Sequence, residues 1–280
     1  MADAWLVRLP APPLRPYVDS YAGYRQAASA GSLHRGLPSR HLTCIVSVGD
    51  PIDVAAQTDP RQPPGRYRFA LSGLQARPAL IRRSAVEEGV AIELTPLGTR
   101  ALLGVPASEL WDTTVEASDV MGAAAVELWE RLQVAAGWEE RFSACDEALG
   151  RMVGRSVGVR RELAAAWRAL VARGGQAAVA EVAADVGWSR QHLGARFARE
   201  FGLSPKLASR VVRFERARGL LAARPASTVA DVAAACGYYD QAHLDLDFAR
   251  FAGCPPTQWR REELPYFQDA ATGASAHSAA

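Results

Sequence analysis

The chain of 280 residues has few cysteines and no long apolar run, and each absence excludes a class of protein. No two cysteines form a Cys-x-x-Cys pair, so buried thiols explain them better than a disulfide framework or a zinc site. The cysteines are Cys44, Cys145, Cys236 and Cys254. No apolar run reaches the roughly 18 residues of a membrane span, and the start of the sequence lacks the pattern of a signal peptide. We therefore expect a cytoplasmic protein without a membrane partner.

Motifs that mark common catalytic and metal sites are also missing. The sequence has no phosphate-binding glycine loop and no His-Glu-x-x-His. His41 and Cys44 are three residues apart and would fall on opposite faces of one strand, so with His34 they do not predict a metal site. We interpret one group of glutamates as solvated charges at strand ends: Glu87, Glu88 and Glu93. We expect neither an enzyme nor a bound cofactor or metal.

The same unit occurs twice near the C-terminus. Val179 to Gly187 pairs with Val229 to Gly237 at an offset of 50 residues. His192 to Pro205 pairs with His243 to Pro256 at an offset of 51, so the turn of the second copy is one residue longer. This regularity makes the repeat the feature around which the rest of the chain is interpreted.

Each copy has the residues of a helix-turn-helix. A short Ala/Val-rich segment ends at a glycine, which can adopt the left-handed conformation that closes a helix. Ser189 in the first copy and Asp240 in the second are suited to cap the next helix. In that helix a leucine and a phenylalanine four residues apart face inward, Leu193 with Phe197 and Leu244 with Phe248. Two such helices at a steep angle are a motif that reads DNA.

The segment from Pro205 to Ala223 joins the two units and has an apolar stripe at helical spacing. Each unit has a glycine after its first helix, Gly187 or Gly237, and ends in a Gly-x-x-Pro segment, residues 202–205 or 253–256. Two such helix-turn-helix units on one long helix resemble the DNA-binding half of the AraC/XylS family of transcription regulators. The segment from Leu94 to Ala107 also resembles the N-terminal half of some members. The resemblance implies double-stranded DNA as the partner, a small-molecule effector or a homodimer contact at the N-terminal half, and a contact with RNA polymerase.

The sequence predicts two domains and a tail. We expect an α+β domain over residues 1–153 with a small, mainly antiparallel sheet, and an all-α domain with the two units over residues 154–268. Residues 269–280 are expected to be disordered. The expected strands are 42–48, 67–71, 79–83 and 90–94. The expected helices of the first domain are 14–24, 96–103, 107–111, 120–135 and 139–153, and residues 159–172 are expected to form the first helix of the second.

With its leucine and phenylalanine inward, the second helix of the first unit would present these residues to DNA: Ser189, Arg190, Gln191, Ala195, Arg196 and Arg199. Gln191 could bridge an adenine, Arg190 and Arg199 could hold phosphate or guanine, and Ala195 could touch a thymine methyl group. Members of the family usually have arginine where Ala195 stands. Arg196 is one step away, and we expect it to turn partly toward the body of the domain.

The second unit would face DNA through Gln241, Ala242, Leu246 and Arg250. Leu246 also stands where the family usually has arginine, and Asp245 and Asp247 would repel phosphate. Three interpretations stay open: the helix reads thymine-rich DNA by apolar contact, it lies off the groove, or its apolar face binds a protein. We hypothesise that the first unit supplies most of the DNA affinity.

Charge supports this hypothesis. Residues 1–150 have a net charge of −4 and residues 151–280 of +6. Within the second half, residues 181–224 have a net charge of +5 and residues 225–263 of −3. We expect phosphate contacts from three residues of the joining helix: Lys206, Arg210 and Arg213.

Two other functions remain open besides a DNA-binding regulator. The chain could be a protein-interaction module in which the apolar face of the second unit is the partner site and DNA binding is weak or vestigial. It could also be an enzyme with an appended DNA-binding domain, which turnover of a ligand would reveal.

Overall fold

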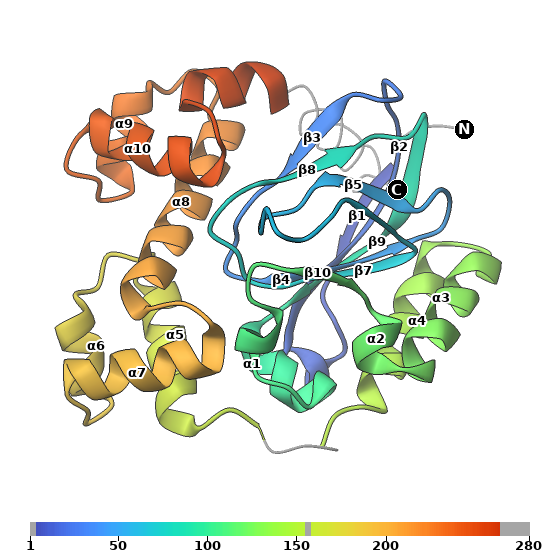
Figure 1. Cartoon of the computed structure of the whole chain (residues 1–280), viewed down its shortest axis with the longest axis horizontal. Helices are drawn as coiled ribbons and strands as arrows, with labels where there is room; N and C mark the ends of the chain where they lie inside the picture. Colours follow the sequence, from blue (N-terminus) through green and yellow to red (C-terminus); the bar gives the residue numbers. More distant parts are fainter. Residues whose placement is uncertain (1–3, 155–157, 264–280) are drawn as a thin grey trace.

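The structure, a computed structural model, describes residues 4–154 and 158–263 and contains two antiparallel sheets in its N-terminal part (Figure 1). The six-stranded sheet has the order β1 (Ala4–Arg8), β2 (Val18–Ala27), β9 (Val86–Leu94), β4 (Leu42–Ser47), β7 (Phe69–Ser72) and β10 (Thr114–Glu116). The four-stranded sheet has the order β3 (Leu33–Gly36), β8 (Ala79–Arg82), β5 (Ile52–Ala56) and β6 (Gly65–Tyr67). The prediction of a mainly antiparallel sheet is therefore confirmed, although the N-terminal part contains more strands than the sequence predicts.

The predicted helix over residues 14–24 is wrong. Pro12–Leu14 form a single 3₁₀ turn, and the chain then enters β2. β2 pairs with β1 on one side and β9 on the other. Val18 and Tyr21 are fully buried in the sheet, so pairing with distant segments outweighs the local helical pattern.

Short helices follow β9 and cover the six-stranded sheet. They are α1 (Pro96–Gly98), η2 (Thr99–Leu103), η3 (Ala107–Leu110), α2 (Ser118–Met121), α3 (Ala123–Val134) and α4 (Trp138–Gly150). The predicted single helix over 120–135 is broken at Gly122, whose φ of +60° and ψ of −138° are not helical. On α4, Asp146 accepts a hydrogen bond of 3.0 Å from the hydroxyl of Tyr21, which ties the helix to β2.

The C-terminal part is helical, as predicted, and runs along the side of the sheets (Figure 1). Its helices are α5 (Arg161–Ala172), α6 (Val179–Asp185), α7 (Arg190–Phe201), α8 (Pro205–Ala223), α9 (Val229–Ala235) and α10 (Gln241–Phe251). Residues 256–263 are also helical. Within residues 4–154 and 158–263, no helix combines the length and apolar character needed to cross a bilayer.

Two apolar clusters form the core of the described residues. The larger begins in the six-stranded sheet and continues without interruption through α5, α6 and α7. The smaller joins α8, α9 and α10 around the buried Trp259. The first helix-turn-helix unit therefore shares its core with the N-terminal part, whereas the second is packed mainly on α8.

Candidate nucleic-acid interface

The turns of the two units have the geometry that the sequence predicts. Gly187 and Gly237 close α6 and α9 with φ of +72° and +73°, a conformation that favours glycine. Ser189 Oγ accepts a hydrogen bond of 3.2 Å from the backbone N–H three residues on. Asp240 Oδ1 accepts the equivalent bond at 2.8 Å. These caps fix the start of α7 and of α10.

The inward residues of both units are buried as predicted. Leu193 and Phe197 of α7 are 0% exposed, and the ring of Phe197 stacks on Trp167 of α5 with centroids 5.7 Å apart. Phe248 of α10 is also 0% exposed and packs edge-on against Phe214 of α8 at 4.9 Å. Because these contacts set the rotation of each helix, they also decide which residues face solvent.

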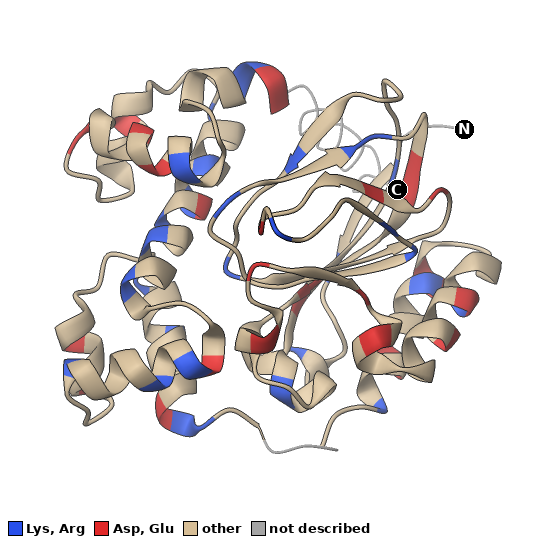
Figure 2. Ribbon diagram, viewed as in Figure 1, with Lys and Arg blue, Asp and Glu red and all other residues tan. Residues whose placement is uncertain are grey.

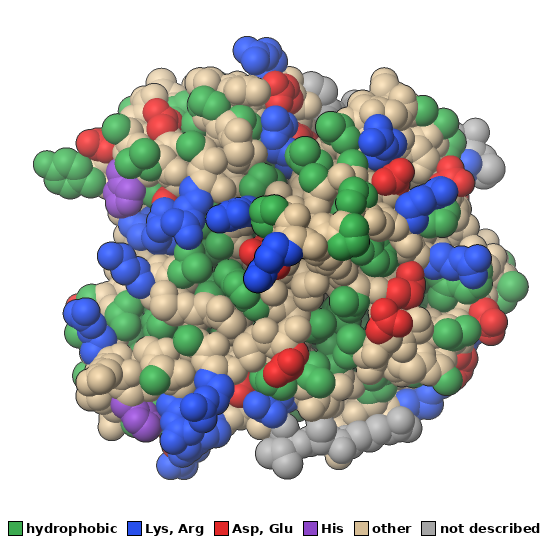
Figure 3. Space-filling view, in the orientation of Figure 1, with side chains coloured by type: hydrophobic (Ala, Val, Ile, Leu, Met, Phe, Trp, Pro, Cys, Tyr) green, Lys and Arg blue, Asp and Glu red, His purple; other side chains and the backbone are tan. Residues whose placement is uncertain are grey.

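The outer face of α7 is exposed and basic. All six predicted residues of the first unit are exposed: Ser189, Arg190, Gln191, Ala195, Arg196 and Arg199. Arg196 was expected to turn partly toward the body of the domain, and in the structure it is exposed although it stands three residues after the buried Leu193. Among the described residues, none forms an ion pair with Arg190, Arg196 or Arg199. Figures 2 and 3 show basic residues over α7 and along α8.

The outer face of α10 has a different character. The four residues predicted to face DNA are exposed: Gln241, Ala242, Leu246 and Arg250. Leu246 is 69% exposed, and Tyr239 in the preceding turn is 93% exposed. This unit therefore presents apolar side chains where α7 presents arginines.

Asp247 does not face a DNA groove, which corrects the prediction that it would repel phosphate. It is 1% exposed and accepts hydrogen bonds from Arg210 Nε at 3.0 Å and Nη2 at 2.6 Å. The hydroxyl of Tyr238 donates to its other oxygen at 3.2 Å. Burial, together with the nearby charge of Asp247, raises the pKa of Tyr238. Helical spacing alone does not predict this burial, because Arg196 occupies the equivalent position three residues after Leu193 and is exposed. The partners Arg210 and Tyr238 make the difference.

Two of the three predicted phosphate contacts are engaged inside the protein. Arg210 is paired with Asp247. Arg213 donates to the carbonyl of Gly237 at 3.2 Å and lies over the ring of Tyr238 at 5.0 Å. Lys206, at the start of α8, is exposed. Arg210 and Arg213 thus hold the second unit on α8, whereas Lys206 forms no ion pair with any residue that the structure describes.

The far end of α7 docks on the N-terminal part. Arg100 Nε donates to Glu200 Oε1 at 2.6 Å, and the hydroxyl of Ser108 donates to the carbonyl of Arg199 at 2.7 Å. Gly202 closes α7 with φ of +81°, and a Cβ there would lie 2.6 Å from the side chain of Trp111. No local sequence signal indicated these contacts, since they join segments about a hundred residues apart.

The second unit also contacts the N-terminal part. Glu263 accepts from His34 Nδ1 at 2.9 Å and from Arg35 Nη1 at 3.0 Å. Burial alone would raise the pKa of Glu263, but these two partners outweigh it and lower the pKa below its ordinary value. A hollow of about 470 Å³ lies beside α10 and is lined by Gln57, Thr58, Pro60, Arg77, Pro78 and Arg250.

Comparison with known proteins agrees with this geometry. A family model for a helix-turn-helix domain matches residues 182–262, and a model for a domain of unknown function (DUF6597) matches residues 7–116. No curated protein matches the chain.

Solved structures resemble either most of the chain or about a third of it. ToxT from Vibrio cholerae O395 has a TM-score of 0.51 at 11% identity, over 85% of this chain and 96% of ToxT. ToxT bound to (E)-4-(8-methylnaphthalen-1-yl)but-3-enoic acid gives 0.52 at 12% identity, over 85% and 97%. A transcriptional regulator from Chromobacterium violaceum with an AraC-type DNA-binding domain is 24% identical over 36% of this chain and 90% of that one, with a TM-score of 0.34.

The likeness to ToxT shows that the arrangement of sheets and helices is a known fold. The helix-turn-helix match begins within α6 and covers α7, α8 and the second unit. The chain therefore contains a helix-turn-helix domain of the DNA-binding type at residues 182–262, in a fold shared with ToxT.

Proposed function

We propose that the chain is a DNA-binding transcription regulator of the AraC/XylS family and that α7 is its main DNA-reading element. The observation that carries the proposal is its outer face, which is exposed, basic and not engaged in ion pairs with other described residues. The proposed contacts are Ser189, Arg190, Gln191, Ala195, Arg196 and Arg199, with Lys206 on a phosphate. In this proposal residues 154–268 bind DNA and residues 1–153 sense an effector, while the expected tail over 269–280 lies outside the described residues.

The second unit is proposed to contribute less affinity. Arg250, the basic member of its predicted contacts, lines the hollow beside the N-terminal part. Leu246 and Tyr239 expose apolar surface next to it. These side chains can meet thymine methyl groups or a protein partner, but they cannot neutralise phosphate.

The exposed apolar face of α10 also supports the second candidate, a protein-interaction site. Leu246 and Tyr239 are 69% and 93% exposed, and neither is packed into the core. A partner there could be RNA polymerase or a second copy of this chain, as the family resemblance implies. Retention of full DNA affinity by Leu246→Ser, together with loss of transcription activation, would favour this candidate.

We propose the hollow of about 470 Å³ as the effector site. Arg77 and Arg250 bring two guanidinium groups to it, one from each part of the chain. Guanidinium groups bind carboxylates and phosphates through paired hydrogen bonds, so an organic anion is the effector class that fits. One ToxT structure holds a carboxylic acid and another holds an unsaturated fatty acid, which supports this class.

We propose that the regulator binds its effector without converting it. The sequence Gly154-Arg-Ser-Val-Gly158 has the Gly-x-Ser-x-Gly spacing of a nucleophile elbow. Such an elbow follows a strand and opens a helix, whereas the segment before Gly154 is α4 and a turn. Ser156 itself lies outside the described residues. The context therefore argues against a hydrolase.

A comparison of Arg190→Ala with Arg250→Ala tests how much of the DNA affinity each of the two units supplies. Fluorescence anisotropy would measure the affinity of each variant, without effector, for double-stranded DNA from upstream of the gene that encodes this protein. Loss of a base or phosphate contact at Arg190 should cost about 1–3 kcal/mol. Arg250→Ala should change affinity by less than about 0.5 kcal/mol. Equal losses in the two variants would contradict the proposal.

A further inference from the structure

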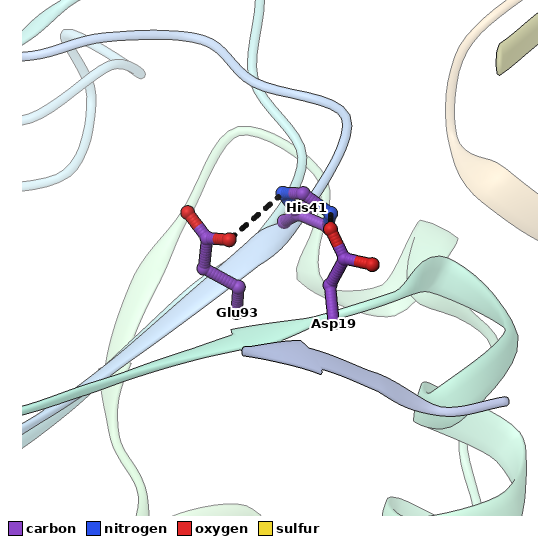
Figure 4. Close-up of side chains that lie close together, drawn as sticks. All are labelled: Asp19, His41 and Glu93. Atoms are coloured by element: carbon purple, nitrogen blue, oxygen red, sulfur yellow. Dashed lines mark ion pairs between the residues drawn. The ribbon is translucent and has the colours of Figure 1, made fainter. Parts of the chain in front are cut away.

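His41 lies where the six-stranded sheet meets the helix that joins the two units. It directly precedes β4 and is 5% exposed. Three carboxylates surround its ring: Asp19 of β2, Glu93 of β9 and Glu215 of α8. Because β9 lies between β2 and β4, strand pairing brings residues together that are far apart in the sequence. Figure 4 shows the imidazole between Asp19 and Glu93.

The two ring nitrogens of His41 have different surroundings. Nε2 lies 3.1 Å from Asp19 Oδ2. Nδ1 is buried and has no hydrogen-bond partner among residues 4–154 and 158–263. The nearest carboxylate oxygens are Glu93 Oε2 at 3.8 Å and Glu215 Oε1 at 3.9 Å. With Nε2 directed at Asp19, Nδ1 faces the carboxylates of Glu93 and Glu215, while Arg40 pairs with Asp19 at 3.0 Å and with Glu215 at 3.6 Å.

The spacing around Nδ1 suits a metal ion. Distances of 3.8 and 3.9 Å are too long for a hydrogen bond. Zinc bonds to nitrogen and oxygen of about 2.0–2.2 Å place two ligand atoms about 3.4 Å apart at a tetrahedral angle, and further apart at wider angles. Small movements of the Glu93 and Glu215 side chains would therefore complete the coordination of an ion at Nδ1.

Neighbouring groups hold these side chains and leave the site accessible. Ser20 Oγ donates to Glu93 Oε2 at 2.9 Å, and Arg40 Nη2 donates to Asp19 Oδ2 at 3.0 Å. Such hydrogen bonds orient the ligands of metal sites. Asp19 and His41 also line a cavity of about 270 Å³ through which an ion can enter.

We propose that His41 Nδ1, Glu93 and Glu215 bind one divalent transition-metal ion, for which zinc is the best match, while Asp19 orients the ring through Nε2. An imidazole with two carboxylates is a donor set that such ions prefer over Ca²⁺ or Mg²⁺. Glu215 faces the same nitrogen from α8. The ion would thus lie between the N-terminal sheet and the helix that carries both DNA-binding units.

Calorimetric titration of the tag-free, full-length protein with zinc chloride tests this site after a chelator has removed bound metal. The wild type should bind one zinc ion per chain. Asp19→Asn and Glu93→Gln should each weaken binding at least tenfold, and His41→Gln should abolish it. His34→Gln is the matched control, because His34 also contacts a carboxylate, Glu263 at 2.9 Å, and should leave binding unchanged.

Two results would overturn the proposal. One is the absence of saturable binding by the wild type, which would leave the cluster as an ion-pair network in which Arg40 and His41 balance the carboxylates. The other is equal affinity in the wild type, Asp19→Asn and Glu93→Gln, which would place the zinc elsewhere. The side chains of Asp19 and Glu93 are 47% and 44% exposed, so these two variants should keep the fold even if His41→Gln does not. The titration is independent of DNA binding, so its result does not depend on the proposed function.

Discussion

Replacing Asp247 with alanine should destabilise the second unit strongly. The carboxylate is 1% exposed and accepts three hydrogen bonds, two from Arg210 and one from Tyr238. Removing one partner of a buried pair costs about 3–5 kcal/mol. The Arg210 side chain is 27% exposed and can recover some hydration, so we expect the lower end, about 3 kcal/mol. For a domain of this size that loss lowers the melting temperature by on the order of 10 °C.

Thermal and urea unfolding followed by circular dichroism would measure this loss. Asp245→Ala is the control on the same helix, and it should change stability by less than about 0.5 kcal/mol because Asp245 forms no ion pair with the described residues. The double variant Arg210→Met/Asp247→Leu should recover much of the stability, since it leaves no unpaired charge. A loss below about 1 kcal/mol for Asp247→Ala would refute the buried-pair explanation. If Asp247→Ala bound DNA more tightly than the wild type, the expectation that Asp247 repels phosphate would be correct after all.

Two further predictions concern the contacts between the parts of the chain. Gly202→Ala and Gly187→Ala both place a side chain in a left-handed conformation, which costs about 1–2 kcal/mol. Gly202→Ala should cost about 1–3 kcal/mol more, because its Cβ would meet Trp111 whereas nothing lies within 4 Å of Gly187; equal urea midpoints would contradict this. Glu263 has a lowered pKa in the folded protein, so its stabilisation is present above its unfolded pKa of about 4.3 and is lost as the pH falls through the lower folded value. Melting temperatures between pH 6 and pH 3 should fall less steeply in Glu263→Gln than in the wild type. The control is Glu130→Gln, which should follow the wild type because Glu130 is exposed and forms no ion pair with the described residues. Identical slopes in all three proteins would exclude the role of Glu263.

The helix-turn-helix units could be predicted in detail because their determinants are local. A glycine, a capping side chain and two apolar residues four apart define each unit within about twenty residues of sequence. Gly187 and Ser189 have the predicted conformation and hydrogen bond. The burial of Asp247 could not be inferred in the same way, because the equivalent Arg196 is exposed and the partners of Asp247 include Arg210 on another helix.

The N-terminal part was predicted less completely because its determinants are distant in sequence. β2 is formed by pairing with β1 and β9, and no spacing within residues 14–24 indicates this. The carboxylates around His41 come from positions 19, 93 and 215. Glu93 was interpreted as a solvated strand-end charge, and in the structure it is half-exposed but turned toward His41 (Figure 4). Only the strand register reveals such a cluster.

Binding of the purified protein to DNA from upstream of its own gene, compared with scrambled DNA over a series of salt concentrations, tests the central claim most directly. If the basic face of α7 reads DNA, log affinity should fall linearly and steeply with log salt, and the upstream DNA should be preferred by about 10³ or more. The slope would give the number of phosphates that the protein engages. Weak binding that ignores sequence, both with and without added cell extract as a source of effector, would contradict the claim.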